Sequence, residues 1–85
     1  MTGDQLLQHA AATVRERRRT YGDPIDLFER VAVRWSQVLG SKITPVQVGL
    51  CLLDLKLARL VHDPEHLDSL VDLAGYAACI REVTR

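Results

Sequence analysis

The sequence predicts an all-α fold of four helices in a single domain, and three observations support it. Apolar residues recur at intervals of three and four along most of the chain, and no segment alternates with the period of two that marks a β-strand. Three dipeptides place a capping side chain before a proline, as helix starts do: Asp23-Pro24, Thr44-Pro45 and Asp63-Pro64. With 85 residues, 47% of them hydrophobic, residues 1–85 can build one core and have no room for a second domain.

The first half of the chain predicts two helices. The first is expected from Asp4 to Arg19 and ends before Tyr21-Gly22, where glycine can supply a left-handed cap. Its expected inward positions are Leu7, Ala10, Ala11 and Val14. The second is expected from Pro24 to Leu39 and stops at Gly40. Its expected inward positions are Leu27, Phe28, Val31, Trp35 and Val38.

The second half of the chain predicts two more helices. The third is expected from Pro45 to His62, and it begins with a capping box because Thr44 is followed three residues later by Gln47. The fourth is expected to start at Glu65 or Leu67 and to end at Val83.

The third helix is apolar on two sides, which predicts an oligomer. Its first apolar face, expected to point inward, consists of Val46, Leu50, Leu53, Leu57 and Leu60. Its second face, on the opposite side, consists of Val48, Cys51, Leu52 and Leu55. Three short companion helices offer little cover for both faces, so we expect a homodimer or a higher homo-oligomer with this helix at the interface. The alternative is a central helix covered by its own chain.

Composition limits the classes of partner. Eleven basic and eleven acidic residues cancel and the sequence pI is near 6.8, so nucleic acid and anionic membranes are not expected and any anion site is local. The N-terminus lacks a basic region before an apolar run, and no stretch approaches the roughly 18 to 20 apolar residues of a membrane span, so a cytoplasmic protein is expected. Cys51 and Cys79 lack CxxC spacing and are expected to be small buried hydrophobes.

Four acidic residues are the candidate metal ligands. Asp68 and Asp72 lie four apart on the fourth helix, so both carboxylates point the same way from successive turns. Like charges on a largely buried helix need a compensating cation, base or proton. Glu29, at the edge of an apolar stripe, and Asp54, inside a long apolar run, are the third and fourth candidates. Carboxylates without cysteine ligands suit Mg²⁺ or Mn²⁺, so Mg²⁺ is the expected cofactor.

Basic and aromatic residues suggest a phosphorylated ligand. Lys56 and Arg59 are three apart on one side of the third helix, and an arginine run that ends at Arg19 closes the first helix; both groups could hold phosphates. Tyr21 could stack on a nucleotide base. Gly75, in mid-helix, indicates the close approach of a neighbouring helix or a ligand.

Each of these candidates has a structural alternative. Asp68 and Asp72 could pair with basic residues across a helix contact, and Asp54 could form a salt bridge within the bundle. Glu29 could be a solvated ion-pair partner. The arginine run could complement the dipole of its own helix, and Tyr21-Gly22 could be only a turn. His62 and His66 bracket the turn before the fourth helix and could supply a ligand, but histidines near helix ends are usually surface or capping residues.

These motifs resemble two groups of known proteins. Most of the chain looks like a family of small uncharacterised phage and prophage proteins, through Arg19-x-Tyr21-Gly22-Asp23-Pro24, Trp35, Lys56-x-x-Arg59 and His66-x-Asp68-Ser69-x-x-Asp72-x-x-Gly75-Tyr76. A Lys-x-x-Arg helix followed by an acidic helix is more distantly similar to the all-α nucleoside triphosphate pyrophosphohydrolases, the MazG and dimeric dUTPase group. That group uses a Glu-x-x-Glu motif and a second acidic pair to hold Mg²⁺ against a nucleotide, generally as dimers or tetramers.

The resemblance implies site residues but not a complete hydrolase. It assigns Glu29, Asp68 and Asp72 to metal and Lys56 and Arg59 to phosphate. The chain departs from the pyrophosphohydrolases because residues 26–30 read Asp-Leu-Phe-Glu-Arg and the second acidic pair is spaced by four. Two functions stay open. The first is a Mg²⁺-dependent nucleotide-binding protein of a phage, which could also act as a nucleoside triphosphate pyrophosphohydrolase in the cytoplasm of the host. The second is a non-enzymatic helical module. Such a module would sequester a nucleotide signal or mediate protein–protein interaction.

Overall fold

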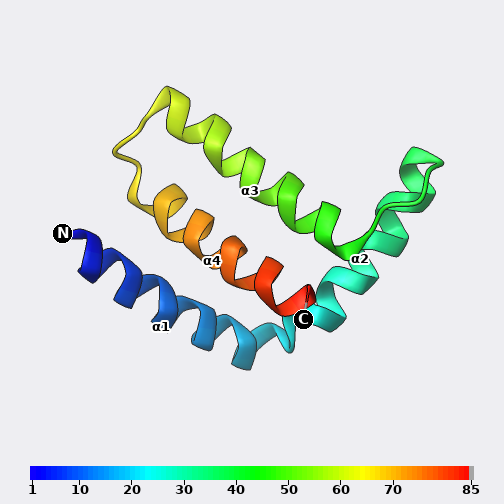
Figure 1. Cartoon of the computed structure of the whole chain (residues 1–85), viewed down its shortest axis with the longest axis horizontal. Helices are drawn as coiled ribbons and strands as arrows, with labels where there is room; N and C mark the ends of the chain where they lie inside the picture. Colours follow the sequence, from blue (N-terminus) through cyan, green and yellow to red (C-terminus); the bar gives the residue numbers. More distant parts are fainter. Residues whose placement is uncertain (85) are drawn as a thin grey trace.

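The computed structural model describes residues 1–84 and consists of four helices, as the sequence predicts (Figure 1). They are α1 (Gly3–Tyr21), α2 (Pro24–Leu39), α3 (Pro45–His62) and α4 (Leu67–Val83). The predicted bounds of α2 and α3 are confirmed, α4 begins at the later of its two expected starts, and α1 runs two residues beyond Arg19. No strand occurs among the described residues.

Side-chain caps fix the starts of these helices. The Thr44 hydroxyl accepts from the Gln47 N–H at 3.2 Å and the Gln47 side chain accepts from the Thr44 N–H at 2.9 Å, which confirms the predicted capping box. Thr2 and Gln5 form a second box at the start of α1. Asp23 caps α2 by accepting from the Ile25 N–H.

The predicted cap of the fourth helix is wrong. Asp63 instead closes α3, because its N–H donates to the Arg59 carbonyl at 3.0 Å. The residue that caps α4 is His66, whose Nδ1 accepts from the Ser69 N–H at 3.3 Å and lies 2.7 Å from the Ser69 hydroxyl oxygen. Asp63-Pro64 therefore forms the turn between two helices, where the Asp63 carboxylate accepts from the Glu65 N–H.

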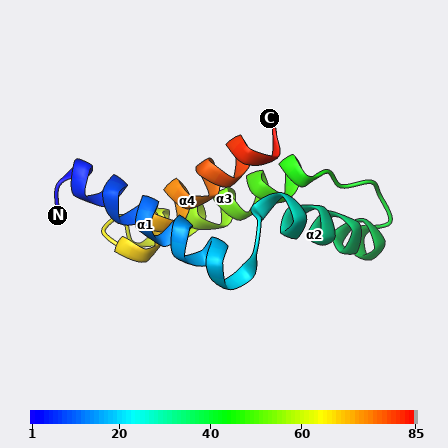
Figure 2. The same cartoon turned by 90° about the horizontal axis from the view of Figure 1, so that it is seen from below.

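The four helices form an open layer rather than a closed bundle. Helix α4 lies between α1 and α3, and α2 crosses the end of this layer near the C-terminus (Figure 1). Figure 2, seen from below, shows that α1, α4 and α3 follow one another across the layer. Within residues 1–84, α1 and α3 do not pack on each other. The molecule measures 42 × 30 × 21 Å, so much of each outer helix faces solvent.

The core lies where α2, α3 and α4 meet. Phe28 and Ala32 of α2 are buried against Val48 of α3, which has no exposed surface. Gly49 lets the Ile80 side chain of α4 pack against the α3 backbone, because a Cβ atom at this position would lie 2.6 Å from Cγ1 of Ile80. Several half-buried side chains complete the cluster: Val31, Trp35, Ile43, Leu52, Tyr76, Cys79 and Val83.

Several predicted inward positions are wrong. On α3, Val48 belongs to the core, whereas Leu50 and Leu57 of the face expected inside are 51% and 44% exposed. The reason is the position of α2, which packs on the Val48 side of α3 and leaves the opposite edge open. Leu7, Ala11, Leu27 and Val38 are also exposed, as is Cys51, which was expected to be buried. No helix in the described part of the chain is long and apolar enough to cross a membrane.

Candidate functional site

A cavity of about 490 Å³ lies between α1 on one side and α2 and α4 on the other. Its floor is apolar and is formed by side chains of all four helices, among them Val14, Phe28, Val31, Leu52 and Val71. The volume falls within the range of about 300 to 1,000 Å³ that is typical of small-molecule sites. The cavity is therefore large enough for a ligand with one apolar ring system.

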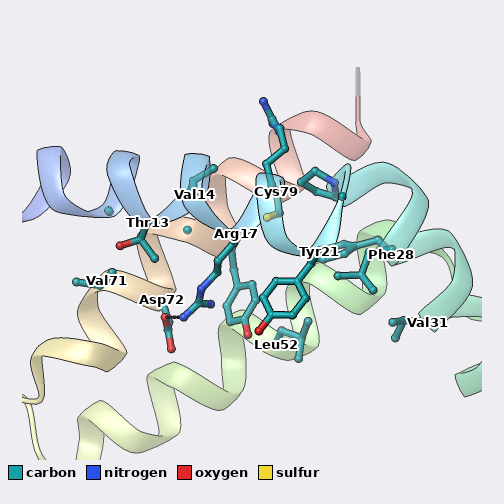
Figure 3. A pocket seen from close by; sticks show the side chains of 17 residues that line it. Thr13, Val14, Arg17, Tyr21, Phe28, Val31, Leu52, Val71, Asp72 and Cys79 are labelled. Atoms are coloured by element: carbon teal, nitrogen blue, oxygen red, sulfur yellow. Dashed lines mark ion pairs between the residues drawn. The ribbon is translucent and has the colours of Figure 1, made fainter.

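Helix α1 supplies both the apolar and the charged part of one wall. Ala10, Val14, Arg17 and Tyr21 follow one another at spacings of four, three and four, so they share the face that points to α4. Ala10 and Val14 are apolar and form the apolar part of the wall. The last two project across the mouth of the cavity (Figure 3). Arg18, the next residue on the same turn, also lines it.

Asp72 joins three helices at this site. Its Oδ2 lies 3.0 Å from Nζ of Lys56 on α3, and its Oδ1 lies 3.4 Å from Nη2 of Arg17 on α1, the contact drawn in Figure 3. The side chains of Asp72 and Lys56 are only 15% and 12% exposed, whereas that of Arg17 is 54% exposed. Asp72 and Lys56 form a nearly buried ion pair, and Arg17 is a solvent-accessible third member.

Two further side chains set the electrostatics of the cavity. Arg18 pairs with Glu82 of α4 at 3.1 Å and is 46% exposed, so most of its donors remain available at the mouth. Burial raises the pKa of the Cys79 thiol above its ordinary value, and the nearby Arg18 charge offsets only part of this effect. At neutral pH, Cys79 is a neutral lining group.

The structure brings together only some of the predicted site residues. Tyr21 and Asp72 line the cavity, and Lys56 lies beside it through its ion pair with Asp72. Arg19 does not line it, and pairs instead with Glu16 on the exposed side of α1 at 2.9 Å. The remaining predicted residues are exposed outside the cavity: Glu29, Asp54, Arg59 and Asp68.

The four predicted metal ligands do not lie close together in the folded chain. Asp72 already uses both oxygens in ion pairs, while Glu29, Asp54 and Asp68 are exposed outside the cavity that Asp72 lines. In residues 1–84, no three His, Cys, Asp or Glu side chains lie close enough together to hold a metal ion. This carboxylate set does not fit a Mg²⁺ cage within a single chain, and Mg²⁺ stays a prediction.

Within the arginine run, Arg17 and Arg18 are the two residues that line the cavity. The run as a whole suggests phosphate binding, but the residue singled out from it, Arg19, points away. The signal that separates them is helical spacing, because Arg17 continues the inward series of Ala10 and Val14 whereas Arg19 does not. Gly75, which indicated close approach, faces Val14 of α1 at an ordinary distance of 3.7 Å.

Comparison with known proteins places the chain in a family. The model of a domain of unknown function, DUF6378, matches residues 5–84. The chain belongs to the DUF6378 family. This match covers α2, α3, α4, all but the first two residues of α1, and the whole cavity, so the site described above lies within the DUF6378 domain.

Relatives of this DUF6378 domain occur in phages, which confirms the predicted likeness to a small phage protein family. The domain is 31% identical over 81 residues to the Gene 55 protein of Mycobacterium phage D29, covering 94% of this chain and 54% of the relative. It is 35% identical over 69 residues to the Gene 55 protein of Mycobacterium phage L5, covering 80% and 44%. The chain thus spans about half the length of these relatives. No solved structure matches it significantly.

Proposed function

We propose that this DUF6378 chain binds a nucleotide or a nucleotide-derived small molecule in the cavity between α1, α2 and α4. The observation that carries the proposal is the composition of this cavity. Its floor is apolar, while two arginines and an exposed tyrosine of α1 stand at its mouth: Arg17, Arg18 and Tyr21. A nucleotide has the same division between a flat ring and an anionic end.

The apolar floor suits the base. Val14, Leu52 and Val71 offer aliphatic surface, and Tyr76 adds a half-buried ring from α4. Tyr21 is 66% exposed, so its ring has little cover of its own and would gain contact by stacking on a bound base. Burying about 100 Å² of apolar surface is worth roughly 2 to 3 kcal/mol, which gives stacking a clear benefit.

The arginines suit the phosphate. A guanidinium carries five N–H donors, and the single ion pairs to Asp72 and Glu82 leave most of those of Arg17 and Arg18 available. Charge-assisted hydrogen bonds from arginine to phosphate are among the strongest in proteins. Asp72 also holds the Arg17 side chain toward the cavity, so part of the entropy cost of ordering it is met before a ligand arrives.

The proposal concerns binding, and the non-enzymatic sequestration of a nucleotide satisfies it. Mg²⁺-dependent hydrolysis of the kind found in the all-α pyrophosphohydrolases goes further, and it requires carboxylates that this chain does not gather on its own. Hydrolysis would require Mg²⁺ to tighten nucleotide binding and a product to form, and the calorimetric titration described next, with and without Mg²⁺, tests the first requirement.

Calorimetry on the full chain tests the proposal. Nucleoside mono- and triphosphates, cyclic dinucleotides and unphosphorylated nucleosides are titrated with Mg²⁺ and with EDTA. A phosphorylated ligand should bind, and Arg18→Gln should weaken that binding by tenfold or more, as expected for about 1.5 to 3 kcal/mol of a charged hydrogen bond. Two arginines outside the cavity are the controls, Arg15→Gln on the same helix and Arg59→Gln on α3.

The cavity also contains a built-in reporter of occupancy. Cys79 lines it, whereas Cys51 is exposed on α3. A bound nucleotide should slow alkylation of Cys79 and leave that of Cys51 unchanged. The proposal fails if no phosphorylated ligand gives heat, or if binding is unaffected by Arg18→Gln and gives Cys79 no protection.

A further inference from the structure

The molecule exposes more surface than a compact chain of its size. Its solvent-accessible surface is 6044 Å², whereas a 9.5 kDa monomer usually exposes about 5,000 Å². Its radius of gyration is 13.5 Å, against about 12 Å for a compact chain of 85 residues. The excess of roughly 1,000 Å² is similar to the roughly 800 Å² that each partner buries in a standard protein interface.

Helix α3 carries an apolar stripe formed by Val46, Leu50, Leu57 and Val61. Leu50, Leu57 and Val61 are 51%, 44% and 87% exposed, and Val46 is partly exposed. At 100° per residue, all four fall within about 60° of one another on the helix. Helix α3 lies at one edge of the layer (Figure 1), and it contacts α2 and α4 through Val48 and Gly49, which lie outside this stripe.

The spacing between the residues of the stripe is the same whether it is read from the N-terminus or from the C-terminus of α3. Its residues are separated by four, seven and four positions, so its midpoint falls between Leu53 and Asp54. Reversing the helix maps Val46 onto Val61 and Leu50 onto Leu57. A surface with this property matches a second copy of itself about a two-fold axis, which is the commonest symmetry of soluble dimers.

We propose that the α3 stripe binds the α3 stripe of a second copy of this chain, with the two helices antiparallel. In this arrangement Leu50 lies opposite Leu57 of the partner subunit, and Val46 opposite Val61 of the partner subunit. The two layers then continue each other edge to edge. The cavity is lined mainly by α1, α2 and α4, and its α3 residue, Leu52, does not belong to the stripe, so this inference is independent of the proposed ligand.

Asp54 gives the arrangement a distinctive electrostatic property. It is exposed and borders the stripe at its midpoint, so two copies of Asp54 approach each other near the two-fold axis. Like charges brought together at an interface weaken it. Removing this charge should therefore strengthen association, which is the opposite of what a random surface substitution does.

Analytical ultracentrifugation of the full chain from about 5 to 500 µM tests the proposal, the range in which weak to moderate dimers dissociate. A dimer is expected, and Leu57→Arg should weaken it at least about tenfold, because the substitution places two unpaired charges in one symmetric interface. The matched control is Leu55→Arg. Leu55 is 47% exposed on the same helix, two residues away and about 160° around the helix axis from Leu57.

Asp54→Asn is the second variant, and it should tighten the dimer. Circular dichroism confirms that each variant is folded, and a sedimentation fit to a single monomer–dimer equilibrium distinguishes tighter dimerisation from aggregation of misfolded chains. Three results would each overturn the proposal: a wild-type monomer at 500 µM, dissociation by Leu55→Arg but not by Leu57→Arg, or an Asp54→Asn variant that associates no more tightly than wild type.

Discussion

Helix α4 has two very different neighbours. On the α3 side the Ile80 side chain lies so close to the α3 backbone that a Cβ atom at Gly49 would be 2.6 Å from its Cγ1, and the Lys56–Asp72 ion pair is almost buried. On the α1 side a Cβ atom at Gly75 would lie 3.7 Å from Val14, an ordinary van der Waals contact, and the cavity lies between the two helices. The comparison indicates that α2, α3 and α4 hold the fold together, while α1 encloses a space.

The composition of the two neighbours explains the difference. Helix α3 is rich in leucine and valine, and it shares the buried cluster with α2. Helix α1 contributes Ala10 as its one fully buried described residue, and its second half carries a run of arginines whose long side chains cannot enter a packed core. A contact made by small and charged residues leaves unfilled volume, and here that volume is the candidate site.

The largest expected effect comes from emptying the tight side. Phe28→Ala should destabilise the fold by about 3 to 5 kcal/mol, because Phe28 is 3% exposed and its removal leaves a cavity among α2, α3 and α4. Leu7→Ala on α1, where Leu7 is 62% exposed, should change the free energy of unfolding by less than about 0.5 kcal/mol. Urea denaturation of both variants measures the contrast, and similar losses would remove it.

The ion pair at the junction should give the next largest effect. Asp72→Asn should cost about 2 to 3 kcal/mol, because Lys56 is left as a nearly buried charge without its carboxylate partner. Asp68→Asn is the control, since Asp68 is exposed, and should stay within about 0.5 kcal/mol. Thermal melts with and without Mg²⁺ measure both. An Asp72→Asn variant that is as stable as wild type without metal would instead favour the predicted metal site.

The helices could be predicted from the sequence because their signals are local. Proline at the first helical position, the Thr44–Gln47 box and Gly40 as a left-handed cap act within a few residues, and the bounds of α2 and α3 are confirmed as predicted. The cap of α4 was the exception, because Asp63 and His66 compete for the same short turn. Local spacing alone does not decide which of them begins the helix.

The site was only partly predictable because it depends on which helices touch. Asp72 and Tyr21 were found from their spacing and type, and both lie at the cavity. Asp68 looked equivalent to Asp72, yet one full turn of α4 separates an exposed residue from one that meets α1 and α3. The faces of α3 were misjudged for the same reason. An all-round apolar helix does not reveal from its own sequence which side α2 will cover.

Substitution of the two mid-helix glycines by alanine should change the free energy of unfolding in opposite directions. Gly49→Ala should destabilise by about 1 to 3 kcal/mol, since the new methyl group would clash with Ile80 and approach Phe28 closely. Gly75→Ala should stabilise by up to about 1 kcal/mol, the helix propensity gained where there is room for a methyl group. Chemical denaturation distinguishes them. If Gly75→Ala were as destabilising as Gly49→Ala, α1 would pack on α4 as tightly as α3 does.

The smallest expected effect is the pH dependence that Cys79 contributes on the loose side. Burial raises the pKa of its thiol above the ordinary value of 9.0, with Arg18 opposing the shift. The folded state therefore holds this proton to higher pH than the unfolded state does. The stabilisation is complete below about pH 9 and is lost as the pH rises through the raised folded value.

Thermal melts from pH 7 to 10.5 measure this effect as the difference between a Cys51→Ser protein and the same protein carrying Cys79→Ala. Subtracting the two curves removes the titration of lysines and tyrosines that both proteins share. The difference should shrink as the pH rises above 9, because the folded state holds the Cys79 proton more tightly than the unfolded state does. A difference that stays constant from pH 7 to 10.5 would contradict the burial of the Cys79 thiol beside the cavity.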